Sequence, residues 1–190
     1  MSQDLPYPTR KGSVEGREVV VYDNLLGQPE LAQLSAKLQA GKFSRTEYAR
    51  DETIDFKHWV MDFELRDIVR LPIHRLSLMA IDRHFGPGHK AFRSYCNVAL
   101  YGDQLMTHTD CNPTDMVVTA LWYICPEWNL EWGGETLFFN DQGDAIVAVT
   151  PKPGRLVIFD GAIVHVGRPP NRIATQTRYT FAIKFIRKAR

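Results

Sequence analysis

The chain has 190 residues, of which 44% are hydrophobic and 24% charged, and its formal net charge is +1. This composition is typical of one globular domain, and it excludes a chain that is disordered throughout or built mainly of membrane spans. Basic residues are scattered apart from residues 187–190, so the sequence offers no basic patch and predicts no nucleic-acid partner.

The cysteine content and the first residues predict the compartment. Cys96, Cys111 and Cys125 lack the close spacing of a zinc knuckle or a redox pair, which favours free thiols in a reducing cytoplasm. Residues 1–13 are polar and hold two prolines, without the apolar centre of a signal peptide. No run approaches the roughly 18 apolar residues of a spanning helix. We therefore expect a cytoplasmic protein without a membrane partner, and the oligomeric state stays open.

The first half of the chain mixes helical and extended patterns. Leu31, Leu34 and Leu38 recur at helical spacing, and a second apolar stripe ends at the Gly-Pro-Gly of 86–88. The predicted elements are a loose leader at 1–16, a strand at 18–22, a helix at 29–38, irregular structure or short strands at 42–67 and a helix at 71–85.

The second half predicts strands throughout, because short apolar or alternating runs are divided by Gly, Pro, Asn and Asp. The predicted strands lie at 92–101, 116–124, 136–140, 145–150, 156–160, 164–166 and 178–186. Two helices followed by about seven strands predict the α+β class. We expect a single domain over 1–190, with a jelly-roll core, also called a double-stranded β-helix or cupin-like core, at about 92–186 and supporting N-terminal helices.

The segment YGDQLMTHTD at 101–110 carries two metal-ligand side chains. His108 and Asp110 are two residues apart at what reads as the end of a strand, so both would project to one side. Two histidines and one carboxylate are typical of non-haem Fe(II) oxygenases. His165, which follows the apolar run 156–164, is the candidate third ligand, because the other four histidines precede the pair in loop or helix segments. The spacing alone leaves a surface strand end open.

Four motifs in order extend this pattern: the pair at 108 and 110, WGGETLFF at 132–139, GRLVIFDGAIVH ending at 165, and RYTFAIKF at 178–185. With them the sequence resembles the 2-oxoglutarate and Fe(II)-dependent dioxygenases over residues 95–185. It looks most like the prolyl-hydroxylase-like branch, which includes the hypoxia-factor prolyl hydroxylases. The resemblance implies a jelly roll in which His108, Asp110 and His165 bind Fe(II), with 2-oxoglutarate and O2 as cosubstrates.

The resemblance also implies a site for 2-oxoglutarate. Arg178 begins the motif RYT and would bind the far carboxylate, because a buried carboxylate needs a charge partner and a guanidinium provides two donors. Thr180 follows on the same strand face and would donate a further hydrogen bond. The other residues that the resemblance brings to the cosubstrate are Tyr123 and Tyr101, with Arg168 and Arg172 as alternatives to Arg178.

The implied reaction is hydroxylation of an unactivated C–H of a small polar metabolite or amino acid, with release of succinate and CO2. A prolyl or other protein-residue hydroxylase of the same mechanism is the alternative, and desaturation or ring formation stays open. The carboxylate of Asp110 disfavours halogenation, because the family's halogenases have a small residue at this position. A cupin-like metal hydrolase or isomerase and a non-catalytic metal-binding sensor are the competing classes. Candidate substrate-pocket residues are Asn97, Arg50 and Trp59.

Overall fold

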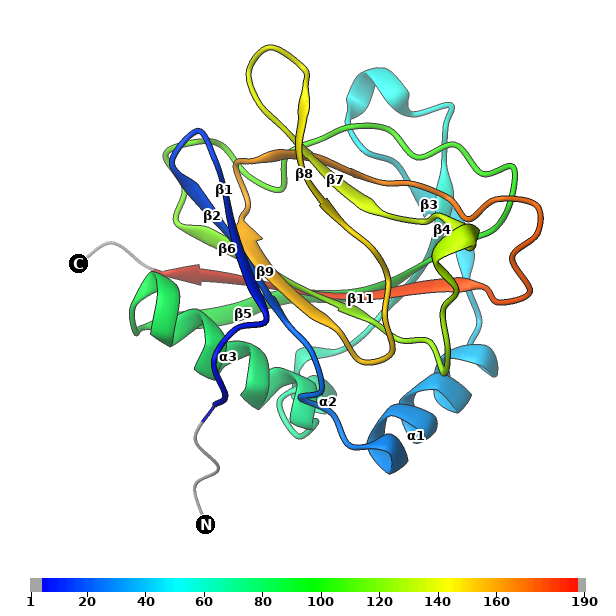
Figure 1. Cartoon of the computed structure of the whole chain (residues 1–190), viewed down its shortest axis with the longest axis horizontal. Helices are drawn as coiled ribbons and strands as arrows, with labels where there is room; N and C mark the ends of the chain where they lie inside the picture. The colour runs from blue at the N-terminus through cyan, green and yellow to red at the C-terminus, as the bar shows by residue number, and fades with distance from the viewer. Residues whose placement is uncertain (1–4, 188–190) are drawn as a thin grey trace.

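The computed structural model describes residues 5–187, which form a large sheet, a small sheet and three α-helices (Figure 1). The large sheet has eight antiparallel strands in the order β1-β2-β9-β6-β11-β5-β4-β3, and the small sheet has three in the order β10-β7-β8. The two sheets face each other as the layers of a jelly roll. Among the helices of this described segment, none is both long and apolar enough to span a bilayer.

The predicted helices and the predicted strands of the second half lie within a few residues of their expected bounds. The strands are β1 Arg10–Val14, β2 Arg17–Tyr22, β3 Ser44–Glu47, β4 His58–Asp62, β5 His89–Ala99, β6 Val117–Tyr123, β7 Thr136–Phe139, β8 Ala145–Val149, β9 Leu156–Asp160, β10 Val164–Gly167 and β11 Arg178–Arg187. The helices are α1 Gln28–Gln39, α2 Leu65–Ile68 and α3 Pro72–Phe85, with 3-10 turns at Asp51–Thr53 and Leu130–Trp132.

The prediction of a loose leader is wrong for residues 10–14, and residues 1–4 lie outside the described part of the chain. Residues 10–14 form the edge strand β1, which pairs with β2 through a turn at Glu15 and Gly16, whose φ angles are 48° and 76°. The segment RKGSV has no apolar alternation of its own, so its order comes from pairing with the buried strand β2. Because β1 to β4 all join the large sheet, that sheet extends beyond the predicted core of 92–186.

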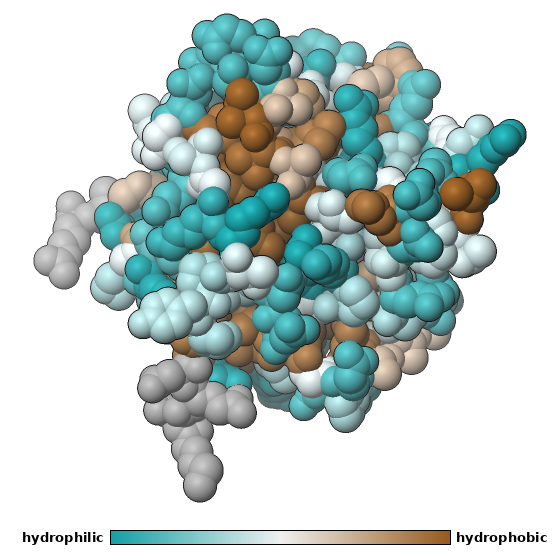
Figure 2. All heavy atoms as spheres, in the orientation of Figure 1, coloured by the Kyte–Doolittle hydropathy of each residue, from teal (hydrophilic) through white to brown (hydrophobic). Residues whose placement is uncertain are grey.

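Two apolar layers hold the fold together. Helices α1 and α3 lie on one face of the large sheet, where Leu38, Ile73 and Trp122 are buried, and the small sheet covers the other face (Figure 1). Between the sheets, Phe138 and Phe159 are buried with their rings 4.9 Å apart. Burial of each such side chain contributes about 1.5–3 kcal/mol. The outer surface is mostly hydrophilic on the face shown in Figure 2, with apolar side chains gathered over the small sheet.

The two faces of the central strand β11 carry different side chains. Phe181, Ile183 and Phe185 belong to the apolar cluster between the sheet and the helices. Because side chains alternate along a strand, the intervening residues point into the space between the sheets. These residues are Arg178, Thr180, Ala182 and Lys184. β11 therefore separates a structural core from the space between the sheets, where two cations, Arg178 and Lys184, are buried.

Candidate functional site

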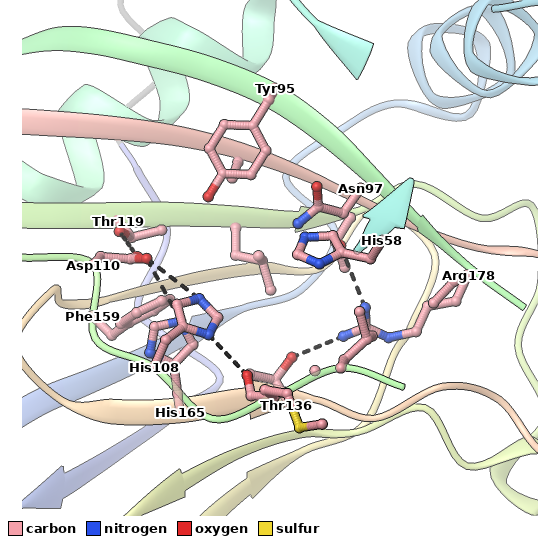
Figure 3. Close-up of a pocket in the computed structure, with 17 residues that line it drawn as sticks. His58, Tyr95, Asn97, His108, Asp110, Thr119, Thr136, Phe159, His165 and Arg178 are labelled. Carbon is pink, nitrogen blue, oxygen red and sulfur yellow. Dashed lines mark hydrogen bonds and ion pairs between the residues drawn. The ribbon is translucent and has the colours of Figure 1, made fainter. Parts of the chain in front are cut away.

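Three metal-ligand side chains converge in a cavity between the sheets (Figure 3). The predicted strand end is wrong for the pair, since His108 and Asp110 lie in a loop after β5. Their alignment comes from β10, because His108 and His165 exchange backbone hydrogen bonds of 3.0 and 2.9 Å. The Asp110 backbone N–H also donates to the Gly161 carbonyl at 2.7 Å. One ligand atom from each of the three residues lies within 4.8 Å of the other two.

The backbone orients both imidazoles. Nδ1 of His108 lies 3.1 Å from the Met106 carbonyl, and Nδ1 of His165 lies 2.9 Å from the Ile163 carbonyl. A carbonyl can only accept, so each Nδ1 carries a proton, and in the neutral imidazole Nε2 has the free lone pair that can bind a metal. Those Nε2 atoms lie 3.7 and 3.9 Å from Oδ1 of Asp110. Burial lowers the pKa of His165 to about 4, so its imidazole is neutral at pH 7 and able to bind a metal.

The carboxylate of Asp110 is ionised although its side chain is only 2% exposed. Burial by itself would raise the pKa of Asp110, but His165, Lys184 and His108 outweigh burial and hold it well below its ordinary value. Thr119 donates to Oδ2, while Oδ1 accepts no hydrogen bond of acceptable geometry. A buried oxygen with a free lone pair, facing two Nε2 atoms, fits a divalent metal. The three residues could therefore hold a divalent metal ion.

Arg178 lies elsewhere along the cavity wall, buried with 3% exposure. Its guanidinium donates to the Gly134 carbonyl at 2.7 Å, to Thr136 at 3.0 Å and to Thr180 at 3.3 Å. All three acceptors are neutral, and no carboxylate among residues 5–187 forms a salt bridge with it. Burial lowers the pKa of Arg178, but a guanidinium is so strongly basic that it stays charged in the protein. A buried cation without an anion is costly, so this arrangement fits the carboxylate of a ligand.

Two glycines make room for that guanidinium. A Cβ on Gly167 would lie 3.0 and 3.1 Å from the two terminal nitrogens of Arg178. A Cβ on Gly134 would lie 2.9 Å from the ring of Trp128 and 3.3 Å from Cδ of Arg178, and Gly134 has a φ of +81°. Both positions therefore require glycine for the observed approach of backbone and side chain. This explains part of the WGG motif in physical terms.

Of the other predicted cosubstrate and substrate residues, some line the cavity and others do not. Asn97 and Thr180 line the cavity. Tyr123 lies behind its wall and donates to Thr136 at 2.7 Å and to the Val149 carbonyl at 3.0 Å, so its contact with Arg178 is through the ring, 5.4 Å from the guanidinium carbon. The alternatives Arg168 and Arg172 are exposed.

The structure does not bring Tyr101, Arg50 or Trp59 to the cavity wall. Tyr101 is 67% exposed because the loop after β5 turns outward at its position. Arg50 lies outside the cavity, where it donates to the Thr107 carbonyl and pairs with Glu52. Trp59 alternates with the buried residues on either side of it in β4, so it faces away from them. Contrary to the predictions, none of these three residues lines the cavity.

Several residues in or beside the cavity were not predicted from the sequence. His58 and Tyr95 line the cavity from β4 and β5, Thr119 and Thr136 hold Asp110 and Arg178, and Lys184 contacts Asp110. Lys184, Tyr95 and Thr119 each had a usable signal, because they fall on the same faces of their predicted strands as Arg178, Asn97 and Tyr123. The others depend on strand pairings far apart in sequence.

Comparison with known proteins supports this geometry. Residues 96–186 match the family model of the 2OG-Fe(II) oxygenase superfamily. No curated protein sequence matches the chain significantly.

Several solved structures share the fold. A prolyl-4-hydroxylase from Pseudomonas putida is 19% identical with a TM-score of 0.68, over 90% of this chain and 93% of its own. A prolyl hydroxylase from Trichoplax adhaerens, in complex with a hypoxia-inducible-factor peptide, is also 19% identical with a TM-score of 0.65, over 88% and 83%. The alpha-ketoglutarate-dependent epimerase SnoN of nogalamycin biosynthesis is 13% identical with a TM-score of 0.68, over 89% and 77%. At these identities the likeness concerns the fold, and it confirms the predicted jelly roll.

Proposed function

Because residues 96–186 match the family model of the 2OG-Fe(II) oxygenase superfamily, we propose that His108, Asp110 and His165 bind Fe(II) and that Arg178 binds 2-oxoglutarate. The bound Fe(II) supplies the redox chemistry by which O2 oxidises 2-oxoglutarate to succinate and CO2 and the substrate is hydroxylated. The single observation that supports this proposal best is the buried Arg178 guanidinium, which faces only neutral oxygens in a cavity shared with the three ligands.

The chain's own residues orient the cosubstrate and limit water. The guanidinium of Arg178 donates to the far carboxylate of 2-oxoglutarate, and Thr180 offers a hydroxyl beside it. Thr136 fixes the guanidinium, because Arg178 donates to it while Tyr123 holds its hydroxyl from behind. The apolar side chains of Leu121 and Phe159 line the cavity and keep its dielectric low, which strengthens these charged contacts.

The substrate we propose is a small polar molecule. Two polar side chains that line the cavity, Tyr95 and Asn97, have no role with the metal or with Arg178. Oδ1 of Asn97 is buried and accepts no hydrogen bond from the described residues, so a polar ligand group would satisfy it. Burial raises the pKa of Tyr95 to about 12, so its hydroxyl remains a donor.

A prolyl or other protein-residue hydroxylase is the second candidate. It is supported by the similar prolyl hydroxylases of Pseudomonas putida and Trichoplax adhaerens, the latter bound to a peptide. Arg178 would bind 2-oxoglutarate for either substrate, so the two candidates differ only in the compound that enters the cavity. Anaerobic soaking of manganese-loaded crystals with 2-oxoglutarate, followed by free amino acids or proline-containing peptides, would separate them by which compound contacts Asn97.

Arg178 also separates the proposal from its competitors, since a metal hydrolase or a metal sensor needs no buried anion site. The test is anaerobic titration of the manganese-loaded protein with 2-oxoglutarate, followed by measurement of succinate after addition of Fe(II) and O2. We expect saturable binding and slow succinate release without substrate. No binding and no succinate would reject the oxygenase proposal in favour of the hydrolase or sensor.

A further inference from the structure

A buried lysine lies beside the proposed metal ligands. Lys184 is six residues after Arg178 on the cavity face of β11, and its side chain is 10% exposed. Its Nζ lies 2.9 Å from Oδ1 of Asp110 and 5.5 Å from the ring centre of Tyr95. A lysine is rarely buried to this extent unless it is paired, and here the partner is a residue that the metal needs.

The ammonium and a metal would compete for one oxygen. Oδ1 of Asp110 is the atom that faces Nε2 of both His108 and His165, and it is also the atom closest to Lys184. The ammonium is within ion-pair distance of Oδ1 but outside hydrogen-bond geometry, so the oxygen keeps a lone pair for another partner. At 2.9 Å the ammonium still attracts Oδ1 strongly, because Coulomb attraction depends little on direction.

The position of Asp110 does not depend on Lys184. Thr119 donates to Oδ2, and the Asp110 backbone is fixed by the Gly161 carbonyl at 2.7 Å. Lys184 therefore contributes its charge to the site rather than the orientation of the ligand. That charge stabilises a buried carboxylate in the absence of metal and repels a divalent cation that binds to the same carboxylate.

We propose that the charge of Lys184 takes the place of the metal at Asp110, stabilising the metal-free protein at the expense of metal affinity. The proposal rests on the proposed function, because it takes His108, Asp110 and His165 as the metal ligands. It assigns Lys184 no contact with substrate. The site then binds a divalent metal more weakly than the same three ligands would bind it without the neighbouring ammonium.

The test compares the full-length protein with Lys184→Met, which keeps the side-chain length and removes the charge, and with Lys184→Arg, which keeps the charge. Mn(II) binding is measured anaerobically by calorimetry without 2-oxoglutarate, and the Tm of each protein is measured with and without Mn(II). We expect K184M to bind Mn(II) at least about tenfold more tightly. We also expect its metal-free Tm to fall and its rise in Tm on metal addition to exceed that of the wild type.

Two controls make the outcomes distinct. Lys90→Met removes an exposed lysine of the neighbouring strand β5 and should leave Mn(II) affinity unchanged, and K184R should stay close to the wild type. Wild-type binding together with unchanged or weaker binding in K184M would overturn the role of Lys184 alone. A wild type whose Mn(II) binding was absent, or unaffected by His165→Ala, would instead overturn the metal site and the proposed function with it. A variant that only lost stability, without tighter metal binding, would also reject the proposal.

Discussion

Arg178 and Lys184 are two buried cations on the same face of β11, and their surroundings differ. Arg178 donates to a carbonyl and two hydroxyls and has no salt bridge within residues 5–187, whereas Lys184 lies 2.9 Å from the carboxylate of Asp110. A buried cation that already has an anion forms a complete pair, and a buried cation without one favours a ligand anion. The partner of a buried charge, more than its burial, therefore indicates whether the charge serves the fold or a ligand.

The largest effect is expected from removing the shared anion. Asp110→Ala removes a metal ligand and leaves Lys184 buried without a partner, so Mn(II) affinity and succinate formation should each fall by at least about 100-fold. Calorimetry and product assays measure the two losses. Asp141→Ala, an exposed carboxylate in the β7–β8 turn, is the matched control and should change neither. Retained metal binding in D110A would show that Asp110 is not a metal ligand, so Lys184 would not compete with a metal there.

The next largest effect is expected from removing the guanidinium of Arg178. Arg178→Ala removes the cation that lacks an internal anion, so the KM for 2-oxoglutarate should rise by about 100-fold while Mn(II) affinity without cosubstrate changes little. Steady-state succinate assays and calorimetry separate these quantities. The exposed Arg172→Ala should behave as the wild type. If R172A raised the KM and R178A did not, the anion site would be reassigned.

A smaller effect is expected from crowding the guanidinium. Gly167→Ala places a Cβ about 3.0 Å from both terminal nitrogens of Arg178, so the side chain must shift from its acceptors. We expect the KM for 2-oxoglutarate to rise by about tenfold, with Mn(II) affinity retained because Lys184 and Asp110 are untouched. An unchanged KM together with an unchanged Tm would show that 2-oxoglutarate binding does not require the close approach of Gly167 to the Arg178 guanidinium.

The smallest expected effect is the pH dependence of stability that His165 causes in the metal-free protein. Burial depresses the pKa of His165 from 6.5 to about 4, so between these values the unfolded chain binds the proton and the metal-free native state does not. The stability that this histidine contributes is therefore present above pH 6.5 and lost as the pH falls toward 4. Denaturant unfolding of the metal-free protein across this range should show it, and His165→Asn should flatten the profile.

Much of the fold was predictable because the patterns are local. Short apolar or alternating runs divided by turn residues predicted β5 to β11 and leucine spacing predicted α1, but β1 was missed because its order comes from β2. In the site, the types and order of His108, Asp110, His165 and Arg178 carried the prediction. Tyr101 was misassigned, since nothing in its neighbourhood in the sequence encodes the outward turn of its loop.

The sequence by itself predicted the chemistry, because the motifs that carry two imidazoles, a carboxylate and a guanidinium resemble those of one enzyme family in type and order. Only the tertiary structure decided which charges meet. The bridge between His108 and β10 aligns the ligands, and the pleat of β11 brings Lys184 to Asp110 while leaving Arg178 among neutral oxygens. Pair energies depend on distance and burial, and both are set by strand pairings between residues far apart in the chain.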